Sequence, residues 1–280
     1  MGVTAWGLAA GRDPDTLVMA VAGTVTLLMI VLERVIPVYA AWNRRRGDLV
    51  ADGLHSIVSI IVIPELLRVA CFGALASFAL WAEGRLGIGL WPHGWPLAAQ
   101  VALALVFIEF AQYWVHRAQH HWPLLWRFHA VHHSAPRLYW LNAGRVHPLE
   151  AVANYLVAVP ILVALGCGAD ALTLYLVLIT TSGSVQHANV DFRLGPLNWI
   201  FSQGENHRWH HAPQKRVADH NFGVVLIIWD VVFGTRKAPG AWPEEVGVEP
   251  VGAYPKGYLA HLWAPFRSST RSIDSPPSIG

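Results

Sequence analysis

Charged residues are scarce in this chain of 280 residues. They make up 14% of it, against about a quarter of a typical soluble domain, whereas 54% of the residues are hydrophobic. This shortfall argues against a large soluble core and indicates burial in a membrane. The formal net charge of +2, with no basic amphipathic stretch outside the histidine-rich region, excludes nucleic acid as a partner.

Cysteine is almost absent as well. The two cysteines, Cys71 and Cys167, lie in apolar runs, so they form no CxxC-type metal site and give little support for a structural disulfide. We interpret both as small buried apolar residues. The N-terminus lacks a basic segment and its first apolar run continues to membrane-spanning length, which argues against a signal peptide.

Apolar runs of about 20 residues can cross a bilayer, and this chain has five candidates. They cover about residues 17–39, 54–81, 97–115, 151–165 and 171–185. Pro64, Glu65 and Arg68 predict a kink or a partly interfacial position in the second run, and residues 166–170 resemble the tip of a helical hairpin. The predicted fold class is therefore all-α, a multi-pass membrane helical bundle with a cytoplasmic cap of histidine-rich helices.

The arginines predict the orientation of this bundle. Arg44, Arg45 and Arg46 directly follow the first run, which places that end in the cytoplasm under the positive-inside rule. Counting spans from there brings every dense histidine segment to the cytoplasmic side and leaves the N-terminus outside. Because arginine is far commoner than lysine and alanine is abundant, we expect an integral protein of a bacterial inner membrane.

Histidine is the residue in excess, with fifteen copies that fall mostly between His116 and His220. Four segments stand out: an HxxxH at 116–120, an HxxHH at 129–133, His187, and an HxxHH at 207–211. Residues three and four apart share a helical face, so we expect each HxxHH segment to direct three imidazoles to one point. The nine candidate metal ligands are His116, His120, His129, His132, His133, His187, His207, His210 and His211.

Nine imidazoles are more than one zinc ion can use, because zinc takes about four ligands. Two metal ions are the natural number, and imidazole suits iron, zinc, copper and nickel alike. His55, His93 and His261 lie outside this pattern, and we expect them to be ordinary interfacial residues.

Other polar residues are candidates for orienting the ligands. Glu109 lies two helical turns before His116 and could orient a ligand or pair with an arginine. Metal-bound histidines usually donate their outer N–H to an acceptor. The further candidates for this surrounding layer are Asp191, Asp219, His147, His220 and His121, the last of which could also replace His120 as a ligand.

These segments resemble the sterol desaturase and fatty acid hydroxylase superfamily. The resemblance covers about residues 107–235 and follows their order and spacing. Its motifs are HRAQH at 116–120, FHAVHHS at 128–134, RVHPLE at 145–150, QHAN at 186–189, PLNW at 196–199, HRWHH at 207–211 and HNFG at 220–223. One position departs from the family pattern, because Gly183 stands where some fatty acid 2-hydroxylases have a further histidine.

The resemblance implies a non-haem di-iron centre (Fe2+/Fe3+) held by the nine histidines, with O2 as co-substrate and a membrane lipid as substrate. It implies a catalytic domain at residues 97–237, after motif-free spans at 1–96 and before a tail at 238–280 that we expect to be loose. Whether the lipid is a sterol, a fatty acyl chain or a related compound, and whether it is hydroxylated or desaturated, stays open.

Electrons must come from a separate donor, such as a ferredoxin or a cytochrome b5-like protein with its reductase. We expect an acidic carrier to dock near six basic residues that lie close in sequence to the ligands: Arg117, Arg127, Arg137, Arg145, Lys215 and Arg216. The alternatives are a zinc-dependent membrane hydrolase, which the absence of an HExxH-like pairing disfavours, and a non-catalytic metal-binding membrane protein.

Overall fold

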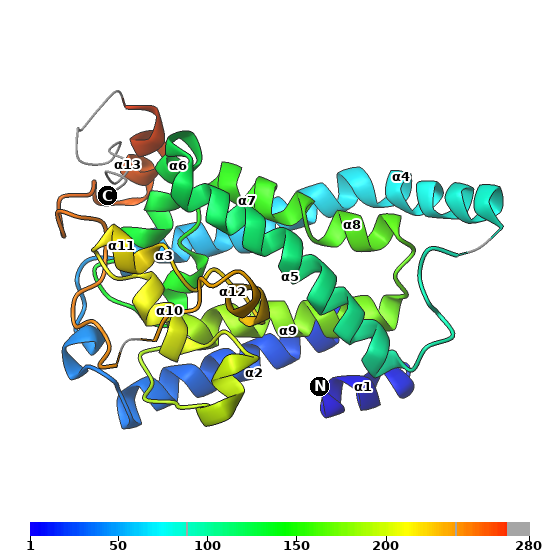
Figure 1. Ribbon diagram of the computed structural model, residues 1–280, viewed down its shortest axis with the longest axis horizontal. Coiled ribbons are helices and arrows are strands. Elements are labelled where there is room, and N and C mark those ends of the chain that lie inside the picture. Colours follow the sequence, from blue (N-terminus) through cyan, green and yellow to red (C-terminus); the bar gives the residue numbers. More distant parts are fainter. Residues whose placement is uncertain (88, 239, 268–280) are drawn as a thin grey trace.

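The computed structural model describes residues 1–87, 89–238 and 240–267. Every regular element in these ranges is helical, and the only strand-like feature in them is an isolated bridge between Phe201 and Leu226. The predicted all-α class is therefore confirmed. Figure 1 shows the long helices lying roughly side by side in an elongated bundle.

Three helical stretches are long and apolar enough to cross a membrane. They are α2 (Pro14–Val35), a continuous stretch over Leu49–Leu86, and α5 (Leu97–His121). The second stretch consists of α3 (Leu49–His55), the π-helical η2 (Ser56–Val62) and α4 (Ile63–Leu86). The π-helical turns end at Val62, two residues before Pro64, which lacks the backbone N–H that an ordinary helical turn needs.

The fourth predicted span is a broken helix. It consists of α7 (Pro148–Leu156) and α8 (Val159–Ala164), and the chain leaves helical geometry at Ala158, close to Pro160. Proline cannot continue a hydrogen-bonded helix, which explains the break. The fifth predicted span is α9 (Ala169–His187), which α8 reaches through a turn with a positive φ at Gly166.

Most of the short helices cover the ends of this bundle. α1 lies at the N-terminus, α6, α10, α11 and α13 lie near the histidine-bearing end, and α12 lies beside the middle of α5 (Figure 1). Their bounds are α1 (Gly2–Ala9), η1 (Ala40–Asn43), α6 (Pro123–His133), η3 (Trp140–Gly144), η4 (Gly195–Trp199), α10 (Gly204–His210), α11 (Lys215–Ala218), α12 (Ile228–Val232), α13 (Tyr258–Trp263) and η5 (Ala264–Phe266).

The helix directions bring the histidine segments to one end of the molecule. α5 and α9 finish there, α6 and α10 lie there, and the arginine-bearing segment after α2 lies there too (Figure 1). The N-terminus, the α4–α5 connection and the α8–α9 turn lie at the other end. A main hydrophobic core of α5, α8 and α9 side chains joins the two ends, including Ala104, Ile108, Leu162, Leu174 and Tyr175.

The segment after residue 239 differs from the loose tail that we expected. Val246 is buried against Trp42 and Leu138, and Tyr254 packs on the α6 face that carries Val131. Apolar side chains spaced along a proline- and glycine-rich sequence thus suffice to hold it against the bundle. Residues 268–280 of the predicted tail lie outside the described residues.

Candidate metal centre

Four helices bring all nine predicted histidines together at one end of the bundle. His116 and His120 come from the last turns of α5, and His187 is the last residue of α9. The other six come from α6 and from α10 with its C-cap. Eight of the nine are buried, and His116 is partly buried.

The nine side chains form two groups, in each of which the candidate ligand atoms lie within 4.8 Å of one another. The five-histidine group consists of His116, His120, His129, His133 and His210. The four-histidine group consists of His132, His187, His207 and His211.

Each HxxHH segment contributes to both groups, so the expectation that it directs three imidazoles to one point was wrong. In α6, His129 and His133 join the five-histidine group and His132 joins the other. In α10 the pattern is reversed, because only His210 joins the five-histidine group. Consecutive residues on a helix diverge by roughly 100°, so the last two histidines of each motif face different points.

In four members of the five-histidine group, the outer nitrogen is bound to an oxygen acceptor. His116 Nδ1 donates to the carbonyl of Phe222 (2.7 Å). His120 Nδ1 lies 3.0 Å from a carboxylate oxygen of Asp219, and His129 Nδ1 lies 2.6 Å from one of Glu150. His210 Nδ1 donates to the carbonyl of His220 (2.8 Å).

Two members of the four-histidine group show the same arrangement. His187 Nδ1 donates to the carbonyl of Gly183 (2.9 Å), and His132 Nδ1 donates to that of Arg145 (3.3 Å). A proton held on Nδ1 leaves the lone pair of Nε2 free for a metal, and this fixed tautomer is typical of metal-binding histidines.

The inner nitrogens lie close together in a way that favours a bound cation over hydrogen bonds between the rings. Nε2 of His129 lies 3.1 Å from Nε2 of both His116 and His133, and Nε2 of His187 lies 3.1 Å from Nε2 of His207. Two nitrogens without protons cannot hydrogen-bond. Burial lowers the pKa of His133 and of His207 well below the usual value for histidine, so protonation does not relieve this crowding. A bound metal ion would relieve the crowding by accepting these lone pairs, so both histidine groups are suited to binding metal.

The candidate ligands also include buried nitrogens without a protein partner. Among the described residues, nothing hydrogen-bonds to Nε2 of His120 or of His210. A buried polar atom without a partner is costly. Both atoms belong to the five-histidine group, where a metal ion would bind them.

In the described part of the chain, Glu109 touches no ligand histidine and pairs with no arginine, so the arginine pairing was wrong and Glu109 can orient a ligand only indirectly. Its carboxylate accepts the backbone N–H groups of Val224 (3.1 Å) and Val225 (2.9 Å). Asp230 likewise accepts the backbone N–H of Phe222 (2.9 Å). The two acids thus hold the turn whose Phe222 carbonyl orients His116.

The other candidates for orienting ligands have different outcomes. Asp219 contacts His120 as anticipated, and His220 acts through its backbone carbonyl and not through its ring. His121 is exposed and donates to the Arg117 carbonyl of its own helix. His147 caps α7 by accepting the Leu149 N–H. Asp191 forms an exposed ion pair with Arg193, away from the groups.

Besides Asp230, sequence reasoning missed four buried acids that support the site. Glu150 orients His129, and its position just after Pro148, in the first turn of a helix, was the available signal. Glu33, Asp48 and Asp52 come from the motif-free residues 1–96, where their presence beside apolar runs was the signal.

These three N-terminal acids brace the loop between α6 and α7. Asp48 pairs with Arg137 (2.6 Å) and Asp52 with Arg145 (2.5 Å), and all four side chains are buried. Glu33 accepts the backbone N–H groups of Trp140 (2.7 Å) and Asn189 (3.1 Å). The N-terminal helices therefore fix the residues that follow two of the histidine segments.

His55 and His261 lie outside both metal groups and are more deeply placed than expected. Both are buried, and His55 Nε2 lies 3.2 Å from His261 Nδ1. This contact joins α13 to α3, so neither ring is a surface residue of the membrane interface.

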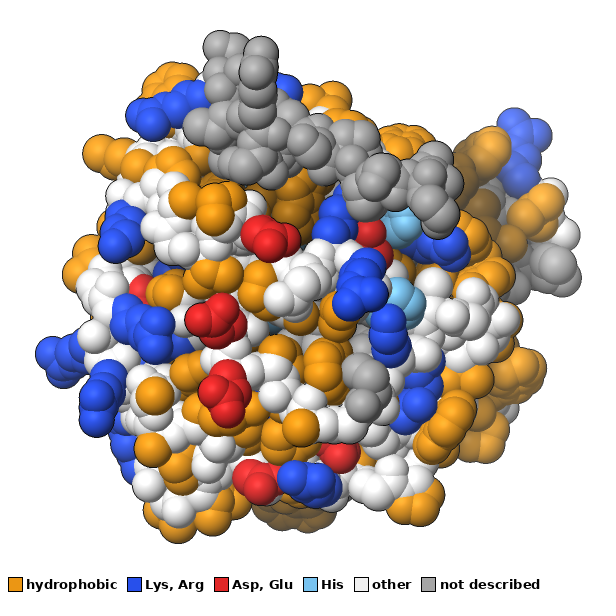
Figure 2. All heavy atoms as spheres, turned by 60° about the vertical axis from the view of Figure 1, so that its left-hand side comes forward, with side chains coloured by type: hydrophobic (Ala, Val, Ile, Leu, Met, Phe, Trp, Pro, Cys, Tyr) orange, Lys and Arg blue, Asp and Glu red, His pale blue; other side chains and the backbone are white. Residues whose placement is uncertain are grey.

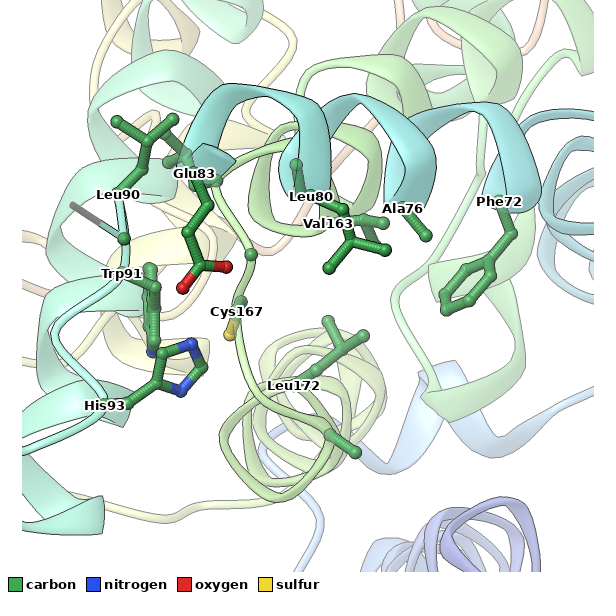
Figure 3. Close-up of a pocket in the computed structure, with 15 residues that line it drawn as sticks. Phe72, Ala76, Leu80, Glu83, Leu90, Trp91, His93, Val163, Cys167 and Leu172 are labelled. Atoms are coloured by element: carbon green, nitrogen blue, oxygen red, sulfur yellow. The ribbon is translucent and has the colours of Figure 1, made fainter. Parts of the chain in front are cut away.

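A cavity of about 360 Å³ lies at the opposite end of the bundle, between α4, the α8–α9 turn and the segment before α5. Figure 3 shows Glu83 and His93 facing it at one end and Phe72 at the other. The cavity therefore lies far along the bundle from the histidines and is not part of the metal centre (Figure 1).

Comparisons with known proteins agree with this geometry. The family model for fatty acid hydroxylase matches residues 101–235, which hold all nine histidines. Ornithine lipid hydroxylase OlsE of Rhizobium tropici is 35% identical over 96% of this chain and 82% of its own length. No solved structure matches the chain.

More distant relatives are alkylglycerol monooxygenases. That of Xenopus tropicalis is 29% identical over 74% of this chain and 45% of its own length. The Homo sapiens protein is 30% identical over 57% and 34%, respectively. This chain thus spans less than half the length of the alkylglycerol monooxygenases that it matches.

Proposed function

Because this chain belongs to the fatty acid hydroxylase family, we propose that it is a membrane-bound O2-dependent lipid oxidoreductase with two iron ions in its histidine groups. The observation that supports two ions best is the division of nine imidazoles into two separate groups. One tetrahedral zinc ion would leave about half of these ligands unused.

The nine histidines could bind such a pair of ions, but no side chain of the protein could do the redox chemistry of the ions. When bound, the ions would activate O2 and supply the oxidant for an unactivated C–H bond, which no side chain can provide. The acceptors bound to Nδ1 keep Nε2 of the ligand histidines unprotonated and directed toward the centre of each group. Glu150 and Asp219 fix two of the rings, and burial of the groups excludes bulk water from them.

The substrate that we propose is a membrane lipid with an amino-acid headgroup, and the reaction is hydroxylation. The ornithine lipid hydroxylase supports this choice, because its similarity extends over 96% of the chain, including the N-terminal helices that brace the site. Ether lipids are the second candidate, supported by the shorter similarity to alkylglycerol monooxygenases. Desaturation begins with the same hydrogen abstraction and would yield a product two hydrogen atoms lighter.

Expression in a bacterium that makes both lipid classes tests this proposal. We expect mass spectrometry of the lipid extract to show an aminolipid that has gained one oxygen atom, in aerated cells only, and metal analysis to find two iron ions per chain. A single zinc ion with no oxidised lipid would support the membrane hydrolase. Bound metal without any lipid change would support a non-catalytic metal-binding protein.

We also propose that the histidine end faces the cytoplasm of a bacterial cell, in its inner membrane. The arginine-bearing segment after α2 lies at the same end of the bundle as the histidines, which supports this orientation. A reporter fused after Thr235 should therefore be active only as a cytoplasmic enzyme, and one fused before α2 only as a periplasmic enzyme. The reverse pattern would overturn the topology.

Electrons for the reaction would come from a separate one-electron carrier, such as a ferredoxin or a cytochrome b5-like protein with its reductase. A cytoplasmic histidine end would place the metal ions within reach of such soluble carriers.

A further inference from the structure

Trp126 connects the surface of the molecule to the five-histidine group. Its ring centroid lies 5.3 Å from that of His120 and 5.4 Å from that of His133, so the indole touches both of these candidate ligands, and the His129 ring lies slightly farther away, at 6.2 Å. The side chain is also partly exposed. Electron tunnelling weakens steeply with distance through the protein, and a conjugated ring in contact with both ligands shortens the gap from the surface.

The other aromatic contacts of the metal groups offer no comparable path. Phe222 also contacts His120 and His210, but it is fully buried. Among the described residues, every ring contact of the four-histidine group is with another histidine. Trp126 is thus the aromatic residue, in the described part of the chain, that both contacts a metal group and reaches the surface.

The surroundings of Trp126 are basic. The Lys215 ammonium lies 5.9 Å from the ring centroid, and exposed Arg216 follows it on α11. The nearby acid Asp219 is engaged by His120 and Lys215, and its side chain is only 14% exposed. Figure 2 shows lysine and arginine side chains gathered beside histidines at this end of the molecule.

Two of the six basic residues expected to attract a carrier cannot do so. Arg137 and Arg145 are buried in their ion pairs with Asp48 and Asp52. The burial of these two arginines removes them from any docking surface, whereas Lys215 lies over the Trp126 ring and the next residue, Arg216, is exposed.

We propose that an acidic one-electron carrier docks over Lys215 and Arg216, and that electrons reach the five-histidine group through Trp126. This inference rests on the proposed function. Each docking transfers one electron, which oxidises the carrier and reduces one ferric ion to ferrous. Two such transfers, with two protons and one O2, balance the formation of one lipid hydroxyl group and one water molecule.

Anaerobic stopped-flow mixing of the iron-loaded protein with a reduced ferredoxin tests this route. Trp126→Leu should slow oxidation of the carrier severalfold at saturating concentration and leave its Kd unchanged, whereas Trp126→Phe, which keeps a ring, should recover part of the rate. Trp122→Leu is the matched control, because Trp122 is exposed and shows no contact with the ligand rings.

Binding to the metal-free protein tests the docking surface separately. Lys215→Glu with Arg216→Glu should raise the Kd for the carrier roughly tenfold at low salt, and the difference should shrink as salt is added. Arg85→Glu, at the opposite end of the bundle, should leave the Kd unchanged. Equal Kd values for the two charge variants would overturn the docking surface.

The outcomes separate this route from the proposed function. If the wild-type protein never oxidises a reduced carrier, the di-iron proposal fails. If the wild-type protein does so and Trp126→Leu matches Trp122→Leu, the route fails alone. Loss of iron from Trp126→Phe would show that the indole only supports the histidines, which also overturns the route.

Discussion

Replacing His210 by alanine should abolish lipid oxidation and lower the iron content, while the protein still inserts in the membrane. His210 Nε2 is buried without a protein partner, and its Nδ1 is already held by the His220 carbonyl. Its removal therefore deletes a ligand without breaking a helix. The loss in metal affinity should exceed the roughly 10–100-fold that removal of a ligand's hydrogen-bond partner typically costs.

His132→Ala makes the same test for the four-histidine group. Its Nε2 lies 3.2 Å from that of His187, so we expect an equal loss of activity from a different metal position. The measurements are iron per chain in purified protein and oxidised lipid in whole cells. His121→Ala is the control, because that ring lies next to His120 but is exposed and bonded to its own helix. Full activity in His210→Ala would refute the di-iron centre.

Spacing in the sequence predicted this cluster well, because helical periodicity acts locally. His116 and His120, or His207 and His211, lie one turn apart wherever their helix packs. What periodicity could not predict is how the helices are rotated about their axes. Neighbouring histidines of each HxxHH segment diverge in any helix, but the rotation decides which of the two groups each histidine joins. The rotation depends on long-range packing among α5, α6, α9 and α10.

The partners of the ligand histidines were harder to predict, because most are distant in sequence or belong to the backbone. Asp219 lies 99 residues from His120 along the chain, and the acceptor for His116 is a carbonyl 106 residues away. A carbonyl leaves no mark in the sequence. Glu109 is visible as an acid in an apolar run, but only the fold shows that it binds backbone N–H groups and no ligand.

The supporting acids of the N-terminal helices were equally hard to predict, because they belong to no recognisable sequence motif. Asp52 shares α3 with one other polar side chain, that of His55. Its carboxylate accepts from Arg145 (2.5 Å) and from the Tyr139 hydroxyl (2.6 Å). Arg145 in turn offers its backbone carbonyl to His132 Nδ1. One buried ion pair therefore links the N-terminal helices to the four-histidine group.

Asp52→Ala should destabilise the protein by about 3–5 kcal/mol, because it leaves the Arg145 guanidinium buried without its counter-charge. The measurement is thermal unfolding of the purified protein in detergent, together with iron content. Asp52→Ala combined with Arg145→Leu removes both charges and should recover part of the loss. The control is Asp191→Ala, which breaks the exposed pair with Arg193 and should cost about 1 kcal/mol or less. Equal stability of Asp52→Ala and Asp191→Ala would contradict a bracing role, whereas loss of iron from Asp52→Ala at temperatures below its unfolding would show that the brace positions His132 as well as supporting the fold.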